Sequence, residues 1–203
     1  MAARPFHGRT WAGEAGHFAL EDVYLFRNLK DYFTSIMRLH QRQGMDNMIL
    51  TATAADDLRI QDIAARTGVF SQEEVDCVGQ LWQEYLTLGP QHCGYNFIVV
   101  RKEEEVVSFA CYGPRDLTEG VFDLYWIAVD PSFHRNGVGR ELLTATETAI
   151  REACGRMIIA ETSGTPHYEP ARKFYTSMGY SSEASITDFY KKGDDLVIFV
   201  KRL

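Results

Sequence analysis

The sequence predicts an α/β protein with a mixed sheet. Helix-like and strand-like segments alternate along most of the chain, two pairs of strand-like segments are joined by short polar turns, and others are separated by a whole helix. Short turns make neighbouring strands antiparallel, whereas helical crossovers make them parallel. The 203 residues, 45% hydrophobic and 24% charged, are enough to bury one core of this kind.

The first elements are one strand and two helices. Residues 47–54 (NMILTATA) predict a strand, and Asp56 or Asp57 caps the helix that follows. Ser71 and Glu74 have the spacing of a capping box, which predicts a second helix that ends at a Gly-Pro pair.

The rest of the chain continues the alternation. In chain order we expect a hairpin, a strand, a helix, a short strand, a helix and a final pair of strands, over residues 95–114, 121–131, 137–155, 156–162, 169–178, and 181–191 with 194–203. No internal repeat interrupts this order.

Residues 1–44 form an N-terminal extension to a domain that spans residues 45–203. Within the extension, residues 22–42 place apolar side chains at steps of three and four, which predicts an amphipathic helix. Three interpretations stay open. The extension packs on the domain, it mediates self-association as a homodimer, or it is translated from a start upstream of the natural one at Met45.

Charge and cysteine usage exclude several function classes. A formal net charge of −7 argues against nucleic acid as a partner and fits a cationic substrate such as an amine. The four cysteines include no C-x-x-C pair and no His/Cys cluster, so we expect no metal, and reduced thiols in the cytoplasm. No segment is suited to span a bilayer or to act as a secretory signal, so we expect no membrane partner.

A glycine-rich turn leads into the helix at 137–155. In PSFHRNGVGREL, residues 131–142, the turn carries Gly137 and Gly139 beside Arg135 and Arg140. The start of a helix has unsatisfied N–H groups and a partial positive charge, and glycine lets a ligand approach the backbone closely. The pattern predicts an anion cradle. The alternative is an ordinary turn in which the glycines only relieve crowding.

The flanks of this turn favour the cradle. DLYWIAVDPSFHRNGVGRELL, residues 123–143, resembles the acetyl-CoA-binding segment of the GNAT superfamily of N-acetyltransferases, where two residues separate an Arg or Gln from the Gly-x-Gly or Gly-x-Ala that follows. The pattern falls on His134, Gly137 and Gly139, with His134 in place of Arg or Gln. The resemblance implies that acetyl-CoA, as co-substrate, is bound by His134, Arg135, Asn136, Gly137, Val138, Gly139 and Arg140. It also implies that a bulge frees the backbone of Ile127, Ala128 and Val129 for the pantetheine arm.

A second segment, YEPARKFYTSMGY at residues 168–180, resembles the late helix of the same superfamily. Ala171, Tyr175, Gly179 and Tyr180 fall on its pattern, although Tyr168 stands where Asn is common. The resemblance covers about residues 46–203. It implies a mixed, mostly antiparallel central sheet with helices on both faces, and an acetyltransferase domain over residues 45–203.

Acetyl transfer to an amine needs a base, a polarised thioester carbonyl and a proton for the leaving thiolate. By resemblance, the Tyr175 hydroxyl supplies that proton. The base is Glu161 or Asp123, which lie on neighbouring predicted strands. We place Glu161 first, because it lies at the carboxyl end of its strand, where ligands of α/β sheets usually bind.

The sequence therefore predicts an enzyme, an acetyl-CoA-dependent N-acetyltransferase that acts on a primary amine by direct attack in a ternary complex. We expect the amine to belong to a small molecule. The alternatives are a protein N-acetyltransferase and a non-catalytic CoA-binding sensor or interaction module.

Overall fold

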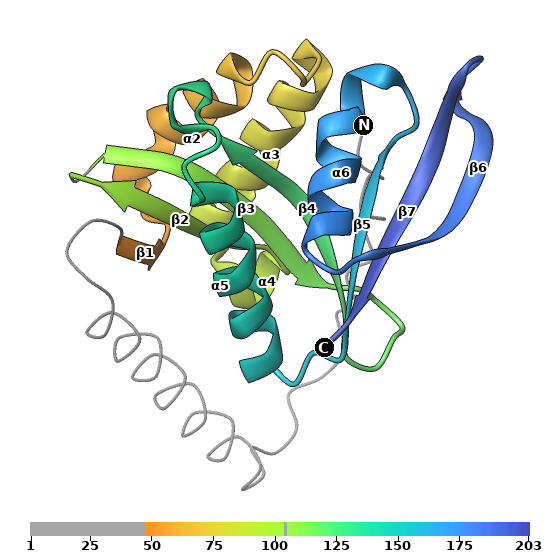
Figure 1. Cartoon of the computed structure of the whole chain (residues 1–203). Helices are drawn as coiled ribbons and strands as arrows, with labels where there is room; N and C mark the ends of the chain where they lie inside the picture. The colour runs from red at the N-terminus through yellow and green to blue at the C-terminus, as the bar shows by residue number, and fades with distance from the viewer. Residues whose placement is uncertain (1–47, 104) are drawn as a thin grey trace, which may run out of the picture. The chain divides into compact units, whose positions relative to one another are not determined.

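The structure is a computed structural model that describes residues 48–203 except Glu104. The predicted N-terminal extension lies outside the described residues. Seven strands form one sheet in the order β1-β2-β3-β4-β5-β7-β6 (Figure 1). Only β4 and β5 are parallel, and all other neighbours are antiparallel. The predicted mixed, mostly antiparallel sheet is confirmed.

The elements follow the predicted order. Their bounds are β1 Met48–Thr51, α2 Asp57–Arg66, α3 Gln72–Leu88, α4 Pro90–Cys93, β2 Asn96–Lys102, β3 Glu105–Pro114, β4 Val121–Val129, α5 Val138–Glu152, β5 Met157–Ser163, α6 Glu169–Ser177, β6 Ser181–Lys191 and β7 Asp194–Arg202. The capping box of α3 is present, with the Glu74 N–H donating to the Ser71 hydroxyl over 3.3 Å and the Ser71 N–H donating to the Glu74 carboxylate over 2.8 Å. The short helix α4 was not predicted. It follows because Pro90 can start a new helical turn.

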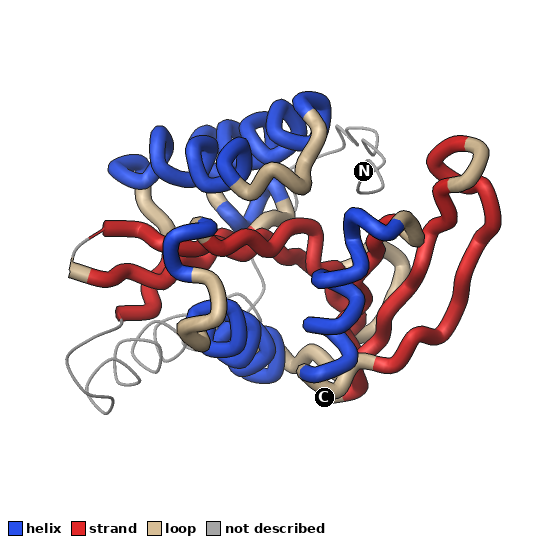
Figure 2. The backbone as a smooth tube through the Cα atoms, turned by 45° about the horizontal axis from the view of Figure 1, so that its top comes forward, coloured by secondary structure: helices blue, strands red, loops and turns tan. Residues whose placement is uncertain are grey.

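Helices cover both faces of the sheet, with α2 and α3 on one side and α5 on the other (Figure 2). Each side has its own hydrophobic core. We call them the α5-side core, which includes Leu142, Leu143, Ile150, Tyr175 and Phe199, and the α3-side core, which includes Ile60, Ile63, Val78, Trp82 and Phe97. The central strands β3, β4 and β5 are therefore covered on both faces, as their near-continuous apolar sequences require, whereas the edge strand β6 is exposed.

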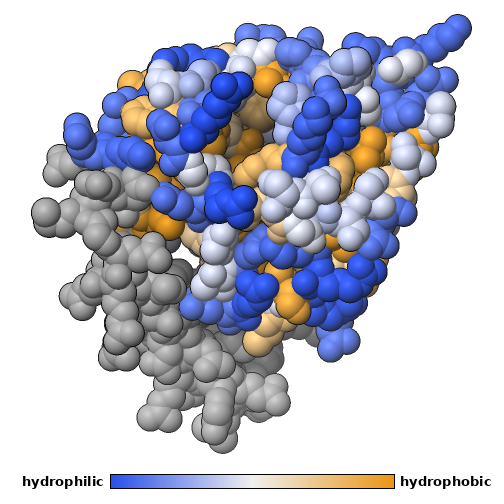
Figure 3. Space-filling view, viewed as in Figure 1, coloured by the Kyte–Doolittle hydropathy of each residue, from blue (hydrophilic) through white to orange (hydrophobic). Residues whose placement is uncertain are grey.

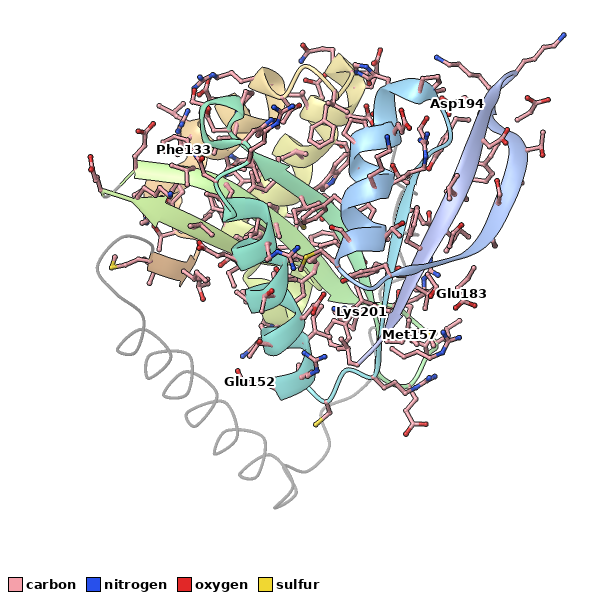
Figure 4. The ribbon with its side chains drawn as sticks, in the orientation of Figure 1. Phe133, Glu152, Met157, Glu183, Asp194 and Lys201 are labelled. Carbon is pink, nitrogen blue, oxygen red and sulfur yellow. The ribbon has the colours of Figure 1, made fainter. Side chains whose placement is uncertain are left out.

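An ion pair ties the α5-side helices to the sheet at one end. The ammonium of Lys201 on β7 donates to both carboxylate oxygens of Glu147 on α5, at 2.8 and 2.7 Å, and to the carbonyl of Met178 after α6, at 2.8 Å. Figure 4 shows Lys201 near the carboxyl end of the chain. This contact fixes the ends of α5 and α6, so any opening between these helices lies toward their starts.

A bulge in β4 changes which face its side chains reach. Leu124 and Trp126 pair with consecutive residues of β3, so Tyr125 is an extra residue. Phe122 and Leu124 consequently pack in the α5-side core, whereas Trp126 and Ala128 pack in the α3-side core. The resemblance implied a bulge on this strand that frees the backbone of residues 127–129, and the structure has the bulge at Tyr125, just before them.

Candidate active site

The parallel strands β4 and β5 separate halfway along their length. Leu124 and Ala160 form their last pair, so β4 beyond Leu124 has no strand partner on this edge among the described residues. On its other edge β4 stays paired with β3, where the N–H of Asp130 donates to the Val107 carbonyl over 2.8 Å. Because backbone groups alternate between the two edges of an antiparallel strand, those of Ile127 and Val129 face the opening.

Ala128, between them, faces β3 by the same alternation. Two of the three backbone positions predicted from the sequence therefore face the gap, although the Val129 carbonyl already accepts a hydrogen bond from the His134 ring.

The surface is hollowed between the start of α5 and α6, with apolar residues at the bottom of the hollow (Figure 3). Half-buried apolar side chains that pack on the α5-side core include Ile127 and Val129 of β4 and Phe174 of α6. Phe133 lies in the turn before α5 (Figure 4). An apolar surface beside backbone groups that face the opening can bind a ligand built of methylene and amide groups.

Within the part of the chain that the structure describes, no side chain caps the start of α5. Arg135 and Gly137 have left-handed backbone angles, with φ of 62° and 80°, and Gly137 is the residue before the helix. The first helical hydrogen bond runs from the Glu141 N–H to the Gly137 carbonyl over 3.0 Å. The N–H groups of residues 138–140 consequently have no acceptor within the helix, at its positive end. This is the geometry of an anion cradle.

The two glycines of the turn differ in what they require. Gly137 needs its positive φ, which any other residue adopts at a cost. At Gly139 a Cβ atom would lie 3.5 Å from Val129 and 3.6 Å from Phe174, which are ordinary contacts. Packing within the chain therefore does not explain the bare backbone at Gly139.

The turn before α5 is held from two directions. The Nε2 of His134 donates to the Val129 carbonyl over 3.0 Å, so this ring nitrogen is used by the turn itself. Asp130, only 1% exposed at its side chain, accepts from Arg59 at 2.6 Å and from Arg66 at 2.7 Å, both on α2. It also accepts from the N–H of Ser132 at 2.8 Å. Sequence reasoning missed this anchor, because its partners lie more than 60 positions away.

These contacts also set the charge of Asp130. Burial alone would raise the pKa of its carboxyl, but the hydrogen bonds from Ser132 and Arg59 outweigh burial and lower it. The carboxylate is thus held ionised, and the turn is fixed to α2 by charge-assisted hydrogen bonds.

Tyr175 projects from α6 into the α5-side core. It is 7% exposed, and its ring centroid lies 5.5 Å from that of Phe199 and 5.7 Å from that of Tyr180. Burial raises the pKa of its hydroxyl, so the group stays protonated. Among the described residues the hydroxyl has no hydrogen-bond partner, and it is available as a donor to a bound group.

The two predicted bases, Asp123 and Glu161, form ion pairs with the same arginine. The Nε of Arg115 is 3.1 Å from Oδ2 of Asp123, and its Nη2 is 3.0 Å from Oε1 of Glu161. The carboxylate side chains are 15% and 16% exposed, and that of Arg115 is 37% exposed. Arg115 was not predicted, because it follows β3 in a turn and belongs to no motif.

The carboxyl of Asp123 is a weaker acid than an ordinary aspartate. Burial raises the pKa of its carboxyl to about 6, Arg115 partly opposes this, and the nearby charge of Glu161 adds to it. A carboxyl with a pKa near neutrality is suited to accept and release protons at physiological pH.

A bridge of hydrogen bonds crosses the α3 side of the site. The Tyr168 hydroxyl lies 2.9 and 3.0 Å from the carboxylate oxygens of Glu74, and the His167 ring donates to the Gly68 carbonyl over 3.1 Å. In the same loop Phe70 packs edge-on against Trp126 of β4, with centroids 5.2 Å apart. The loop between α2 and α3 therefore spans from β4 to the turn that follows β5.

Two further findings concern the described part of the chain. No group of three or more His, Cys, Asp and Glu side chains in residues 48–203 is arranged to hold a metal ion. No helix in this part is both long and apolar enough to cross a membrane.

Comparisons with known proteins identify the family. The family model described as Acetyltransferase (GNAT) family matches residues 58–180. A solved structure of a GNAT-family protein from Desulfovibrio desulfuricans is 38% identical, covers 77% of this chain and 98% of its own, and superposes with a TM-score of 0.74. A search of curated proteins finds no match.

More distant structures share the fold. The ribosomal-protein-S18-alanine N-acetyltransferase of Escherichia coli is 19% identical, with a TM-score of 0.62 over 77% of this chain and 93% of its own. The protein yncA of Salmonella typhimurium, solved with acetyl-CoA, is 18% identical, with a TM-score of 0.61 over 78% of this chain and 95% of its own.

The chain belongs to the GNAT family of acetyltransferases, and it is an enzyme of that type.

Proposed function

We propose that this protein transfers the acetyl group of acetyl-CoA to the primary amine of a small molecule, by direct attack while both substrates are bound. The observation that carries the proposal is the open edge of β4 beside the uncapped start of α5. A long ligand with an anionic middle and an amide-bearing arm matches these two features.

Each part of the cradle has a role in the proposal. The N–H groups of residues 138–140 bind the pyrophosphate of CoA, and Arg135, Asn136 and Arg140 line the turn beside it. The backbone groups of Ile127 and the N–H of Val129, which face the gap, pair with amides of the pantetheine arm. His134 contributes indirectly, because its ring holds the turn to Val129. The acetyl-CoA complex of the Salmonella protein, which has the same fold, supports this ligand class.

The chemistry uses groups on both sides of the gap. A carboxylate, Asp123 or Glu161, takes a proton from the acceptor's ammonium, because an amine attacks only through a free lone pair. The hydroxyl of Tyr175 gives a proton to the departing thiolate. The net change is one amide and one thiol formed, with one proton released to solvent.

A covalent cysteine intermediate is disfavoured. Cys111, on β3, is fully buried, and burial raises the pKa of its thiol well above the ordinary value. A buried neutral thiol is a poor nucleophile. Direct attack on the thioester needs no such group.

The acceptor side favours a small substrate. The bridge from Tyr168 to Glu74 crosses this side, and the aromatic residues Phe70, Tyr125 and Trp126 pack in or against the α3-side core there. A cluster of two carboxylates and one guanidinium has a net negative charge, which suits a cation. With its four cysteines free, we place the enzyme in the cytoplasm.

The test combines binding with turnover. Calorimetric titration of the full chain with acetyl-CoA should show saturable binding, and thiol release should be faster with a small primary amine than with amine-bearing peptides. Faster thiol release with peptides would mean that the acceptor is a protein and not a small molecule. Binding without turnover on any amine would leave a CoA-binding module, and absence of binding would overturn the proposal.

A further inference from the structure

The carboxylates of Asp123 and Glu161 meet where the strands separate. Asp123 lies one residue before the last pair of β4 with β5, and Glu161 lies one residue after it on β5. Arg115 reaches both from the turn that follows β3. One guanidinium therefore spans the two strands at the point where the sheet opens.

The turn that carries Arg115 is itself held in place. The Arg115 N–H donates to the Val121 carbonyl over 2.8 Å, and the Thr118 hydroxyl donates to the Arg115 carbonyl over 2.7 Å. These bonds close the turn onto the first residue of β4. The guanidinium is thus positioned from a fixed backbone, which lowers the entropy lost when it pairs with both acids.

The two acids contact the guanidinium differently. Asp123 binds Nε, the nitrogen nearest the backbone, and Glu161 binds Nη2 at the outer end. Asp116 in the same turn also raises the pKa of Asp123, and the charge of Asp123 in turn raises the pKa of Tyr125 on β4. Tyr190 of β6 interacts electrostatically with Glu161, from the other side.

We infer that Asp123 is the general base of this enzyme, and that Arg115 is the residue that positions it. Glu161, on the neighbouring strand β5, holds Arg115 in place. The inference rests on the proposed function. In the step, the acceptor's ammonium gives one proton to the Asp123 carboxylate, and its nitrogen lone pair then attacks the thioester carbon. The C–N bond forms and the C–S bond breaks, Tyr175 gives its proton to the departing thiolate, and the second proton lost by nitrogen replaces the one that Tyr175 gave. Asp123 later releases the proton to solvent.

This assignment reverses the order expected from the sequence, which placed Glu161 first. Arg115 and Glu161 act on Asp123 with opposite signs, since a nearby cation favours its ionised form and a nearby anion disfavours it. Arg115 and Glu161 thus adjust the pKa of one carboxyl in opposite directions, which a purely structural salt bridge would not require.

The test is the pH profile of kcat/KM in the full-length protein. In the wild type the acidic limb should follow an apparent pKa of about 6. Arg115→Gln should move this limb to higher pH, and Glu161→Gln should move it to lower pH, each by roughly one unit. Arg115→Lys, which keeps the charge, should restore a limb near the wild-type position.

Asp123→Asn should lower kcat/KM by about 10²- to 10⁴-fold, as expected for loss of a general base. Loss of turnover in Glu161→Gln with turnover retained in Asp123→Asn would overturn the inference. The inference would also be overturned if the acidic limb of the kcat/KM profile moved in the same direction in Arg115→Gln and Glu161→Gln.

A second measurement separates this inference from the proposed function. Acetyl-CoA affinity should be unchanged in all four variants, since none lies in the cradle. Carboxyl carbon-13 resonances, with that of Asp123 assigned through Asp123→Asn, should titrate with opposite shifts in Arg115→Gln and Glu161→Gln. If the pKa of the Asp123 carboxyl were the same in Arg115→Gln and Glu161→Gln, the positioning role of Arg115 would be overturned. This result does not depend on finding an acceptor amine.

Discussion

At the scale of a single residue, Tyr175 shows how one side chain can serve both core and chemistry. Its ring packs between Phe199 and Tyr180, while its hydroxyl has no partner among the described residues. We predict that Tyr175→Phe keeps the free energy of unfolding within about 1 kcal/mol, because no protein hydrogen bond is lost. The same change should lower kcat by roughly 10²-fold, because the thiolate loses its acid.

Tyr180→Phe is the matched control for this change. It removes a hydroxyl from a ring in the same cluster, and we expect kcat to stay within twofold of the wild type, a difference of about 0.4 kcal/mol. Stopped-flow thiol release and denaturant unfolding measure the two quantities. An unchanged kcat in Tyr175→Phe would remove the proposed role of this hydroxyl.

The glycine before α5 gives a second test at this scale. Gly137→Ala places a Cβ atom at a φ of 80°, which costs about 1 kcal/mol in the folded state. If the turn relaxes to escape this strain, its N–H groups turn away from the ligand. We therefore expect the Kd for acetyl-CoA to rise by roughly tenfold or more.

Gly193, with a φ of 83° in the turn between β6 and β7, provides the comparison. Gly193→Ala should cost a similar free energy of unfolding and leave the Kd unchanged. Calorimetry on both variants distinguishes the two outcomes. Equal loss of affinity would mean that strain anywhere in the molecule, and not the cradle, controls binding.

At the scale of elements, the turn before α5 depends on α2. Asp130 joins the two through Arg59 and Arg66. We predict that Asp130→Asn lowers the free energy of unfolding by about 2 kcal/mol, less than the usual cost of breaking a buried pair because Arg66 is half-exposed. Affinity for acetyl-CoA should fall as well, because the turn loses its anchor.

The pH dependence of this effect has a definite sign. The folded-state pKa of Asp130 is lowered, so its contribution to stability is complete above about pH 4 and is lost as pH falls through the folded-state pKa. The difference between wild type and Asp130→Asn should therefore shrink at low pH. Denaturant unfolding between pH 3 and 7 measures it.

Asp62→Asn is the control at this scale. Asp62 pairs with the same two arginines, but its side chain is 47% exposed. Its removal should cost less than about 1 kcal/mol, as for most surface pairs. A cost as large as that of Asp130→Asn would show that the arginines, and not the link to the turn, determine the stability.

At the scale of the whole molecule, the hydrophobic clusters and all seven strands are complete within the described residues. We predict that a chain starting at Met45 folds with a thermal midpoint within a few degrees of the full chain and binds acetyl-CoA equally well. Thermal unfolding, calorimetry and size-exclusion chromatography of the two chains measure this.

The three interpretations of residues 1–44 give different results in that experiment. A large fall in midpoint would mean that the extension packs on the domain. A change from dimer to monomer would mean that it mediates self-association. Identical behaviour would agree with a natural start at Met45.

Local signals in the sequence predicted most of the fold. The capping box at Ser71 and Glu74 and the turn at Gly137 each involve residues close in the chain, so their geometry follows from spacing alone. The order of strands and helices followed from periodicity in the same way. The anion cradle was predicted because a helix start needs only neighbouring residues.

The arrangement of the candidate base was decided by tertiary structure. Asp123 and Glu161 were candidates from the sequence, but their meeting on Arg115 depends on the register of β4 with β5 and on a turn that neither strand specifies. The bulge at Tyr125 and the anchor at Asp130 are of the same kind. The sequence alone determined the elements, the family and the glycine turn with its uncapped helix start, because short-range spacing encodes them. Only the packed sheet decided which distant charges share a site, because that depends on contacts between residues far apart in the chain.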